Sequence, residues 1–72
     1  MTEKDFLEMI KEELEIEEEI TMETKFREEI EDWCSLLGFS LLALIEREAG
    51  KIVRPDEFIK AETFRDVYEL LD

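Results

Sequence analysis

Histidine is absent from this chain, and cysteine occurs once, as Cys34. Without histidine, the Ser-His and Cys-His pairs that activate a nucleophile cannot form. A single cysteine cannot close an internal disulfide, and no tetrahedral zinc site of the usual Cys/His kind can be assembled around it. These absences argue against an enzyme and predict no metal site, and the lone cysteine is typical of a reducing cytoplasm.

Basic residues are scarce: 9 stand against 22 acidic residues, which gives a net charge of -13. Such a charge repels the phosphates of nucleic acids and of anionic membrane surfaces. It keeps a protein soluble and monomeric and favours partners that present Lys and Arg. We therefore expect a monomer whose partners are proteins with basic docking patches.

Long hydrophobic runs are also missing. Residues 33–45 form the uncharged stretch WCSLLGFSLLALI, which is shorter than the roughly 20 apolar residues that a membrane-spanning helix needs. The acidic N-terminal sequence lacks the basic and apolar regions of a secretory signal. A chain of 72 residues can organise one core. We expect a single domain over residues 1–72, located in the cytoplasm, without membrane insertion.

The first fifteen residues predict a helix. Phe6, Ile10 and Leu14 recur at helical spacing, and Thr2 precedes them as an N-cap with Asp5 three residues later. The spacing then breaks down, and about twenty residues follow without sustained periodicity. Because long connections in compact domains are uncommon, this one is either functional or wrongly assigned. We expect it to be held to the core by spaced apolar residues, with one helical turn after Thr24. The anchors are Ile20, Phe26 and Ile30.

A second helix is predicted from Ser35, as N-cap, to Gly50, as the residue that ends it. Its spacing directs Leu41 and Ile45 to the core. The flanking positions are Leu37, Leu42, Leu44 and Ala49. Three further apolar residues fall on the opposite side, among residues that prefer water: Leu36, Phe39 and Ala43. They either form a partner-docking surface or pack under the long connection.

The remaining segments complete an all-α prediction. Pro55 suits the first position of a short helix over residues 55–60. Thr63 caps a last helix, and Asp66 completes a capping box. With no alternation typical of strands, the expected fold is a bundle of three main helices plus one short one.

Ser35 has two interpretations from its position alone. It is the N-cap of the second helix, accepting a backbone hydrogen bond, or it is an attachment point, because a helix N-terminus favours the negative charge of a phosphodiester. Cys34 is expected to precede the cap and to pack toward Phe39 as a hydrophobic staple. Trp33 either shields the serine turn or fills the core.

The order of these motifs resembles the acyl carrier protein family over nearly the whole chain. The segments are ITMETKF, WCSLLGFSLLALIEREAG and TFRDVYELL. The residues that match are Ile20, Thr21, Thr24, Phe26, Trp33, Ser35, Leu36, Ile45, Glu46, Gly50 and Thr63. The sequence departs from the family at Cys34, where an aspartate is usual, and at Leu37 and Ser40, in a helix half that is usually acidic.

The resemblance implies a four-helix bundle of acyl-carrier type. It implies that Ser35 receives 4′-phosphopantetheine from coenzyme A through a separate phosphopantetheinyl transferase, and that the arm holds acyl groups as thioesters for fatty acid, polyketide or related lipid biosynthesis. Acyl-processing enzymes would be its partners, and the carrier itself would not catalyse. The alternative is an unmodified acidic helical adaptor that binds a basic protein through Leu36, Phe39 and Ala43. A cysteine-dependent enzyme using Cys34 ranks third.

Overall fold

The computed structural model describes residues 1–71, and these residues form an all-helical structure without strands. This confirms the predicted fold class. Five helices are present, one more than predicted, because the single turn expected in the long connection forms a helix of its own. The helices are α1 (Glu3–Glu13), α2 (Phe26–Glu29), α3 (Ser35–Ala49), α4 (Pro55–Phe58) and α5 (Phe64–Glu69).

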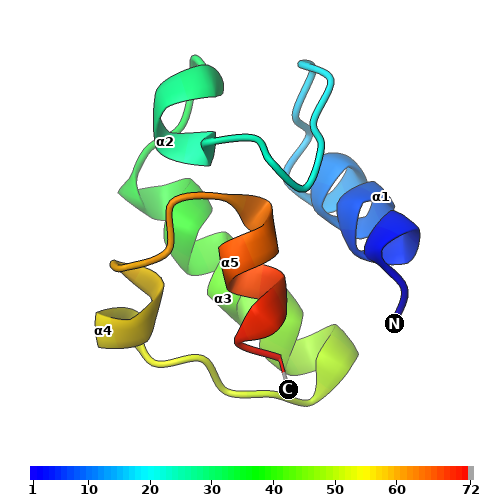
Figure 1. The fold of residues 1–72 in the computed structure, drawn as a ribbon, viewed down its shortest axis with the longest axis vertical. Coiled ribbons are helices and arrows are strands. Elements are labelled where there is room, and N and C mark those ends of the chain that lie inside the picture. Colours follow the sequence, from blue (N-terminus) through cyan, green and yellow to red (C-terminus); the bar gives the residue numbers. More distant parts are fainter. Residues whose placement is uncertain (72) are drawn as a thin grey trace.

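Helix α1 begins where its cap residue predicts. The hydroxyl oxygen of Thr2 accepts a hydrogen bond from the backbone N–H of Asp5 at 3.1 Å, which satisfies one of the free donors of the first turn. Phe6 and Ile10 are fully buried, as their spacing predicts. Helix α1 packs against α3, the long helix that crosses the middle of the molecule in Figure 1.

The connection between α1 and α3 is held to the rest of the fold, as predicted. Of its three predicted anchors, Phe26 and Ile30 are buried, and Ile20 is half-buried against the core. The buried hydroxyl of Thr24 accepts a hydrogen bond from the N–H of Thr21 at 2.8 Å. The carbonyl of Met22 accepts a hydrogen bond from the N–H of Arg65 at 2.8 Å, so the connection is fastened to the first turn of α5.

Helix α3 ends at Gly50, as predicted. Gly50 adopts the left-handed conformation, with φ 67°, that ends many helices and is costly for residues with a Cβ. Leu41 and Ile45 are fully buried, and Leu44 is nearly so. Ala49, expected on the flank of the buried face, is exposed at the last turn of the helix.

The two C-terminal helices, α4 and α5, begin at the residues that the sequence predicts. Pro55 opens α4, which ends at Phe58 and is thus shorter than the predicted range 55–60. The hydroxyl of Thr63 accepts a hydrogen bond from the N–H of Asp66, and the carboxylate of Asp66 accepts one from the N–H of Thr63. The predicted capping box at the start of α5 is therefore confirmed.

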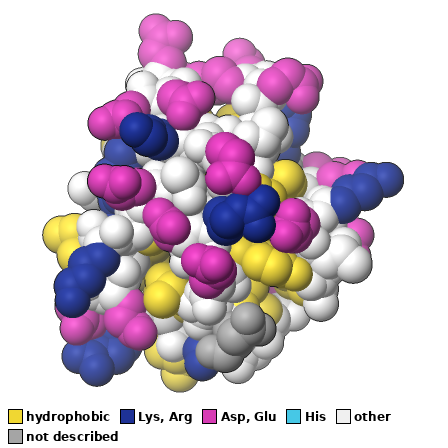
Figure 2. Space-filling model, in the orientation of Figure 1, with side chains coloured by type: hydrophobic (Ala, Val, Ile, Leu, Met, Phe, Trp, Pro, Cys, Tyr) yellow, Lys and Arg dark blue, Asp and Glu magenta, His cyan; other side chains and the backbone are white. Residues whose placement is uncertain are grey.

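One hydrophobic core joins all these segments. Its fully buried large side chains are Phe6, Phe26, Phe64, Ile10, Leu41, Ile45 and Val67. Carboxylates cover much of the surface, as Figure 2 shows for one face. Within residues 1–71, no helix combines the length and the apolar character needed to cross a membrane.

Candidate functional site: a hydroxyl beside an apolar pocket

The start of α3 differs from the prediction by one residue. Cys34, with φ -149° and ψ 176°, is the N-cap, and Ser35 is the first helical residue. No side chain accepts a capping hydrogen bond at this end. The prediction that Ser35 caps the helix is therefore wrong.

Contacts of the preceding turn explain this shift. The N–H of Trp33 donates to the carbonyl of Ile30 at 3.1 Å, and the N–H of Glu31 donates to the carboxylate of Glu18 at 2.8 Å. The hydrogen bond from Glu31 also lowers the pKa of the Glu18 carboxyl group. The indole ring of Trp33 packs on the ring of Phe26 with centroids 4.8 Å apart. These contacts determine where the chain enters the helix.

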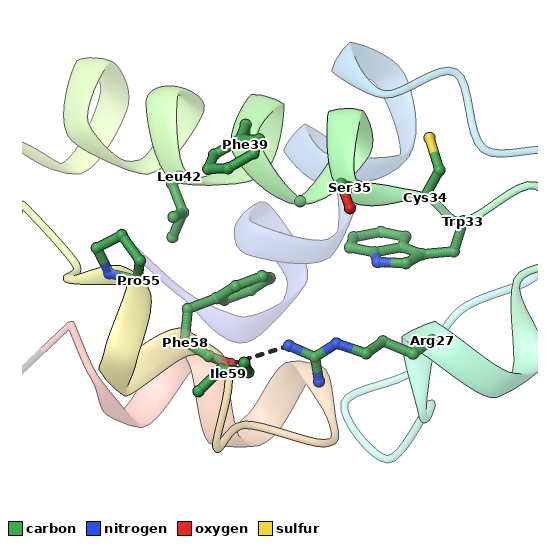
Figure 3. Close-up of a pocket in the computed structure, with 10 residues that line it drawn as sticks. Arg27, Trp33, Cys34, Ser35, Phe39, Leu42, Pro55, Phe58 and Ile59 are labelled. Carbon is green, nitrogen blue, oxygen red and sulfur yellow. Dashed lines mark hydrogen bonds between the residues drawn. The ribbon is translucent and has the colours of Figure 1, made fainter.

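Cys34 does not form the predicted hydrophobic staple. It is the cap residue itself rather than the residue before it, and its side chain is exposed. In Figure 3 its sulfur points away from the ring of Phe39. Trp33 is half-buried and packs against the core, which agrees with the core-packing interpretation.

Ser35 is exposed at the tip of α3, and its hydroxyl takes no part in a cap. Figure 3 shows the hydroxyl on the side of α3 that faces α4. Because Ser35 is in the first turn of a fifteen-residue helix, it lies among backbone N–H groups that have no partner within the helix. A negatively charged substituent on this oxygen is therefore favoured by the helix dipole.

A pocket of about 410 Å³ opens beside this hydroxyl, between α3 and α4. It combines residues from α2, the turn before α3, α3 itself and the α4 region. The lining residues are Arg27, Trp33, Cys34, Ser35, Gly38, Phe39, Leu42, Pro55, Phe58 and Ile59. Most of these side chains are apolar, so the pocket is suited to a hydrocarbon group held next to the serine.

Gly38 allows α4 to approach α3 closely at this pocket. A Cβ atom at Gly38 would lie 3.3 Å from the ring of Phe58, which is tighter than an ordinary contact. The absence of a side chain at Gly38 therefore lets the Phe58 ring sit against the backbone of α3.

The three residues predicted to be left over from the core are exposed. Leu36 is 72% exposed and Phe39 is 64% exposed. Ala43 is exposed as well. The alternative in which they pack under the long connection is wrong. Phe39 also lines the pocket, which joins part of this surface to the site of Ser35.

Sequence reasoning missed the far wall of the pocket. Ile59, which is 73% exposed, and Phe58 come from the α4 region, and Arg27 comes from α2. These residues are distant from Ser35 in sequence. No local pattern therefore indicates that they line the same pocket as Ser35. The sequence gives one signal for Ile59: no apolar residue follows it at helical spacing, so it has no partner on a buried helix face.

Arg27 is held in place by two backbone carbonyls and two aromatic rings. Its guanidinium donates to the carbonyl of Phe58 at 3.0 Å and to that of Ala61. The same group lies 4.7 Å from the ring centre of Phe26 and 5.1 Å from that of Phe58. Arg27 thereby joins α2 to the end of α4, at the edge of the pocket.

The groups gathered at this site can be stated from the structure. In the part of the chain that the structure describes, no group of acidic, cysteine or histidine residues is arranged to hold a metal ion. The site offers an accessible hydroxyl, free helix donors next to it and an apolar hollow beside it. Comparison of the chain with models of protein families, with curated proteins and with solved structures finds no match.

Proposed function

We propose that this protein is a carrier of acyl groups, held as thioesters on a 4′-phosphopantetheine arm that is esterified to Ser35. The single observation that carries the proposal is the free hydroxyl of Ser35 at the tip of α3, beside the apolar pocket. A carrier needs such a hydroxyl for attachment, and a hollow next to it can shield an acyl chain from water. The protein itself then performs no catalysis.

The arrangement of elements supports an acyl-carrier-type bundle. A long connection with a single helical turn precedes α3, and a short helix, α4, separates α3 from the Thr-capped α5. The order matches the one implied by the resemblance between this sequence and the acyl carrier family. The serine of the resemblance also falls at the start of the long helix.

Charge supports the expected partners. A net charge of -13 favours enzymes that present basic docking patches, among them the phosphopantetheinyl transferase and the enzymes that process the acyl group. Leu36, Phe39 and Ala43 provide exposed apolar contacts beside the attachment point. We place this activity in the cytoplasm, in fatty acid, polyketide or related lipid biosynthesis.

The experiment is an intact-mass measurement after incubation with coenzyme A, magnesium and a transferase. We expect one phosphopantetheinyl increment in the wild type and none in Ser35→Ala. Ser40→Ala is the matched control, because Ser40 is the only other serine of the chain and lies five residues further along α3. It should be modified like the wild type.

The departure at Cys34 is included in the same experiment. Cys34→Asp restores the residue that is usual in the acyl carrier family before the serine. Several transferases should be used on both proteins. If neither the wild type nor Cys34→Asp gains mass with any of them, the proposal is contradicted.

A second candidate is an unmodified adaptor that binds a basic protein. The exposure of Leu36 and Phe39, at 72% and 64%, is the observation that favours it. The two functions differ in their dependence on Ser35. Partner binding by an adaptor is unaffected in Ser35→Ala and reduced in Phe39→Ser, whereas a carrier loses its activity in Ser35→Ala.

A further inference from the structure

The pocket beside Ser35 has an unusual charge for this protein. Although 22 of the 72 residues are acidic, no carboxylate is among the residues that line the pocket. Its one charged lining residue is the cation Arg27. The pocket is therefore an apolar hollow with a positive charge at its edge, on a protein that is negative nearly everywhere else.

Arg27 differs from the other arginines of the chain. Each of the other three forms an ion pair: Arg47 with Glu13 and Glu48, Arg54 with Asp56, and Arg65 with Glu3 and Glu23. Among residues 1–71, no carboxylate lies within 4.0 Å of the Arg27 guanidinium. Arg27 is exposed and forms no such ion pair, so its guanidinium can still pair with a carboxylate of a ligand.

The acidic residues around Arg27 lie outside the pocket of Ser35. The carboxylate of Glu29 accepts a hydrogen bond from the N–H of Lys25 at 2.7 Å, at the start of its own helix. Glu28 and Glu62 line a separate, smaller hollow that Arg27 also borders. Neither of them lines the pocket of Ser35.

The position of Arg27 is determined before any ligand arrives. Hydrogen bonds to the carbonyls of Phe58 and Ala61 use two of its five N–H donors, and the rings of Phe26 and Phe58 lie against the guanidinium. Three donors remain. Hydrogen bonds between a guanidinium and a carboxylate are charge-assisted, and the planar guanidinium can offer two parallel donors to one carboxylate.

From this geometry we infer that the pocket selects an aliphatic chain that ends in a carboxylate, with Arg27 as the residue that determines this specificity. A chain ending in a methyl group or a neutral hydroxyl lacks the charge pairing, and one ending in an ammonium group is repelled. At about 410 Å³ the pocket has room for an aliphatic chain of the length tested below. That such a chain arrives as the cargo of Ser35 rests on the proposed function.

The test uses the unmodified protein and free ligands of equal length. Trp33 is the only tryptophan of the chain and lines the pocket, so its fluorescence reports on occupancy. Titration with octanoate, 1-octanol and octylamine should show octanoate binding about tenfold more tightly than 1-octanol, as expected for one charge-assisted hydrogen bond. The net charge of -13 opposes anion binding in general, so this preference must come from a local cation.

Two variants of equal charge separate Arg27 from that general effect. In Arg27→Gln the preference for octanoate over 1-octanol should disappear. Arg54→Gln, which removes an arginine paired with Asp56, should keep it. Equal affinity of the wild type for octanoate and 1-octanol would overturn the inference, and so would an undiminished preference in Arg27→Gln.

A measurement on the wild type covers the case in which Arg27→Gln does not fold. In a ¹H–¹⁵N spectrum, the Nε–H resonance of Arg27 should shift on addition of octanoate and not on addition of 1-octanol. An unchanged Nε–H resonance at saturating octanoate would overturn the inference. Because these experiments need no arm on Ser35, their failure is separate from a failure of the mass experiment above.

Discussion

The N-termini of α3 and α5 differ in how their free backbone N–H groups are satisfied. Every helix begins with backbone N–H groups that have no partner within the helix. At α5, Thr63 and Asp66 satisfy two of these groups with a complete capping box. At α3, which is the longest helix, the cap residue is Cys34 and no side chain accepts a hydrogen bond.

The start of α5 is built for stability, whereas the start of α3 leaves its polar groups accessible. The start of α5 is fastened by its side chains and by the backbone of the long connection, since the N–H of Phe64 donates to the carbonyl of Thr24. The start of α3 keeps its donors and the hydroxyl of Ser35 accessible. A cap that is missing where a hydroxyl is exposed supports the attachment role that we propose for Ser35. Four experiments address this comparison.

The largest change in the free energy of unfolding is expected at the capped start of α5. Thr63→Ala removes the acceptor for the N–H of Asp66, so the free energy of unfolding should fall by about 1 to 2 kcal/mol. Urea denaturation followed by circular dichroism measures the change. Thr63→Ser keeps the hydroxyl and should lose less than half as much; an equal loss in both variants would show that the cap is not the cause.

A substitution can supply a side-chain cap at the start of α3, where none is present. Cys34 already has the extended backbone of an N-cap residue, and serine at this position can accept a hydrogen bond from the first turn of α3. Cys34→Ser should therefore raise the free energy of unfolding by about 0.5 to 1 kcal/mol. Cys34→Ala is the control, and the explanation by capping is wrong if alanine stabilises as much as serine.

Acid should act directly on the cap at the start of α5, because a carboxylate forms part of it. The N–H groups of Glu62 and Thr63 donate to the carboxylate of Asp66 and lower its pKa below the ordinary value of 3.8. Because the folded-state pKa is depressed, this contribution to stability is present above about pH 3.8 and is lost as the pH falls through the lower, folded value.

The acid effect is measured locally, since protonation of many carboxylates changes the global stability as well. The amide resonances of Glu62 and Thr63 should titrate with Asp66, and those of Leu36 and Leu37 in the first turn of α3 should not follow the same curve. In Asp66→Asn the titration of the two amides should be absent. Titration that persists in this variant would assign it to another group.

The smallest effect is expected for Ser35→Ala. As an N-cap, Ser35 would contribute about 1 kcal/mol, but in the structure it is the first helical residue and makes no cap. Alanine also has the higher helix propensity. The free energy of unfolding should therefore change by less than about 0.5 kcal/mol. A loss of 1 kcal/mol or more would mean that the hydroxyl is engaged in the fold.

Much of the fold could be predicted because its signals are local. Thr2 with Asp5, Gly50, Pro55 and Thr63 each act on the few residues next to them, through a hydrogen bond or a preferred φ angle. Helix beginnings and ends of this kind depend little on the rest of the molecule. Their positions were therefore predicted correctly.

The start of α3 was predicted one residue late because a distant contact decides it. Serine is a better N-cap than cysteine by local preference. The packing of Trp33 on Phe26 and the hydrogen bond between Glu31 and Glu18 place the chain so that Cys34 takes the cap position instead.

The pocket, too, could be predicted only where it depends on local sequence. Ser35 and the exposed residues Leu36 and Phe39 follow from one stretch of sequence and its helical period. Arg27 and Ile59 reach the pocket from other helices, and their approach depends on how the whole chain packs. Nothing in the residues around Arg27 distinguishes it from the other three arginines.

The links between α1 and α5 have a consequence for how the molecule opens. Arg65 forms an ion pair with Glu3 at 3.2 Å, and the ring of Tyr68 packs on that of Phe6 with centroids 5.1 Å apart. We therefore expect these two segments, which are remote in sequence, to open together as a cooperative unit. Amide hydrogen exchange should show nearly equal protection in the middle of α1 and in α5, with neither helix detaching ahead of the other.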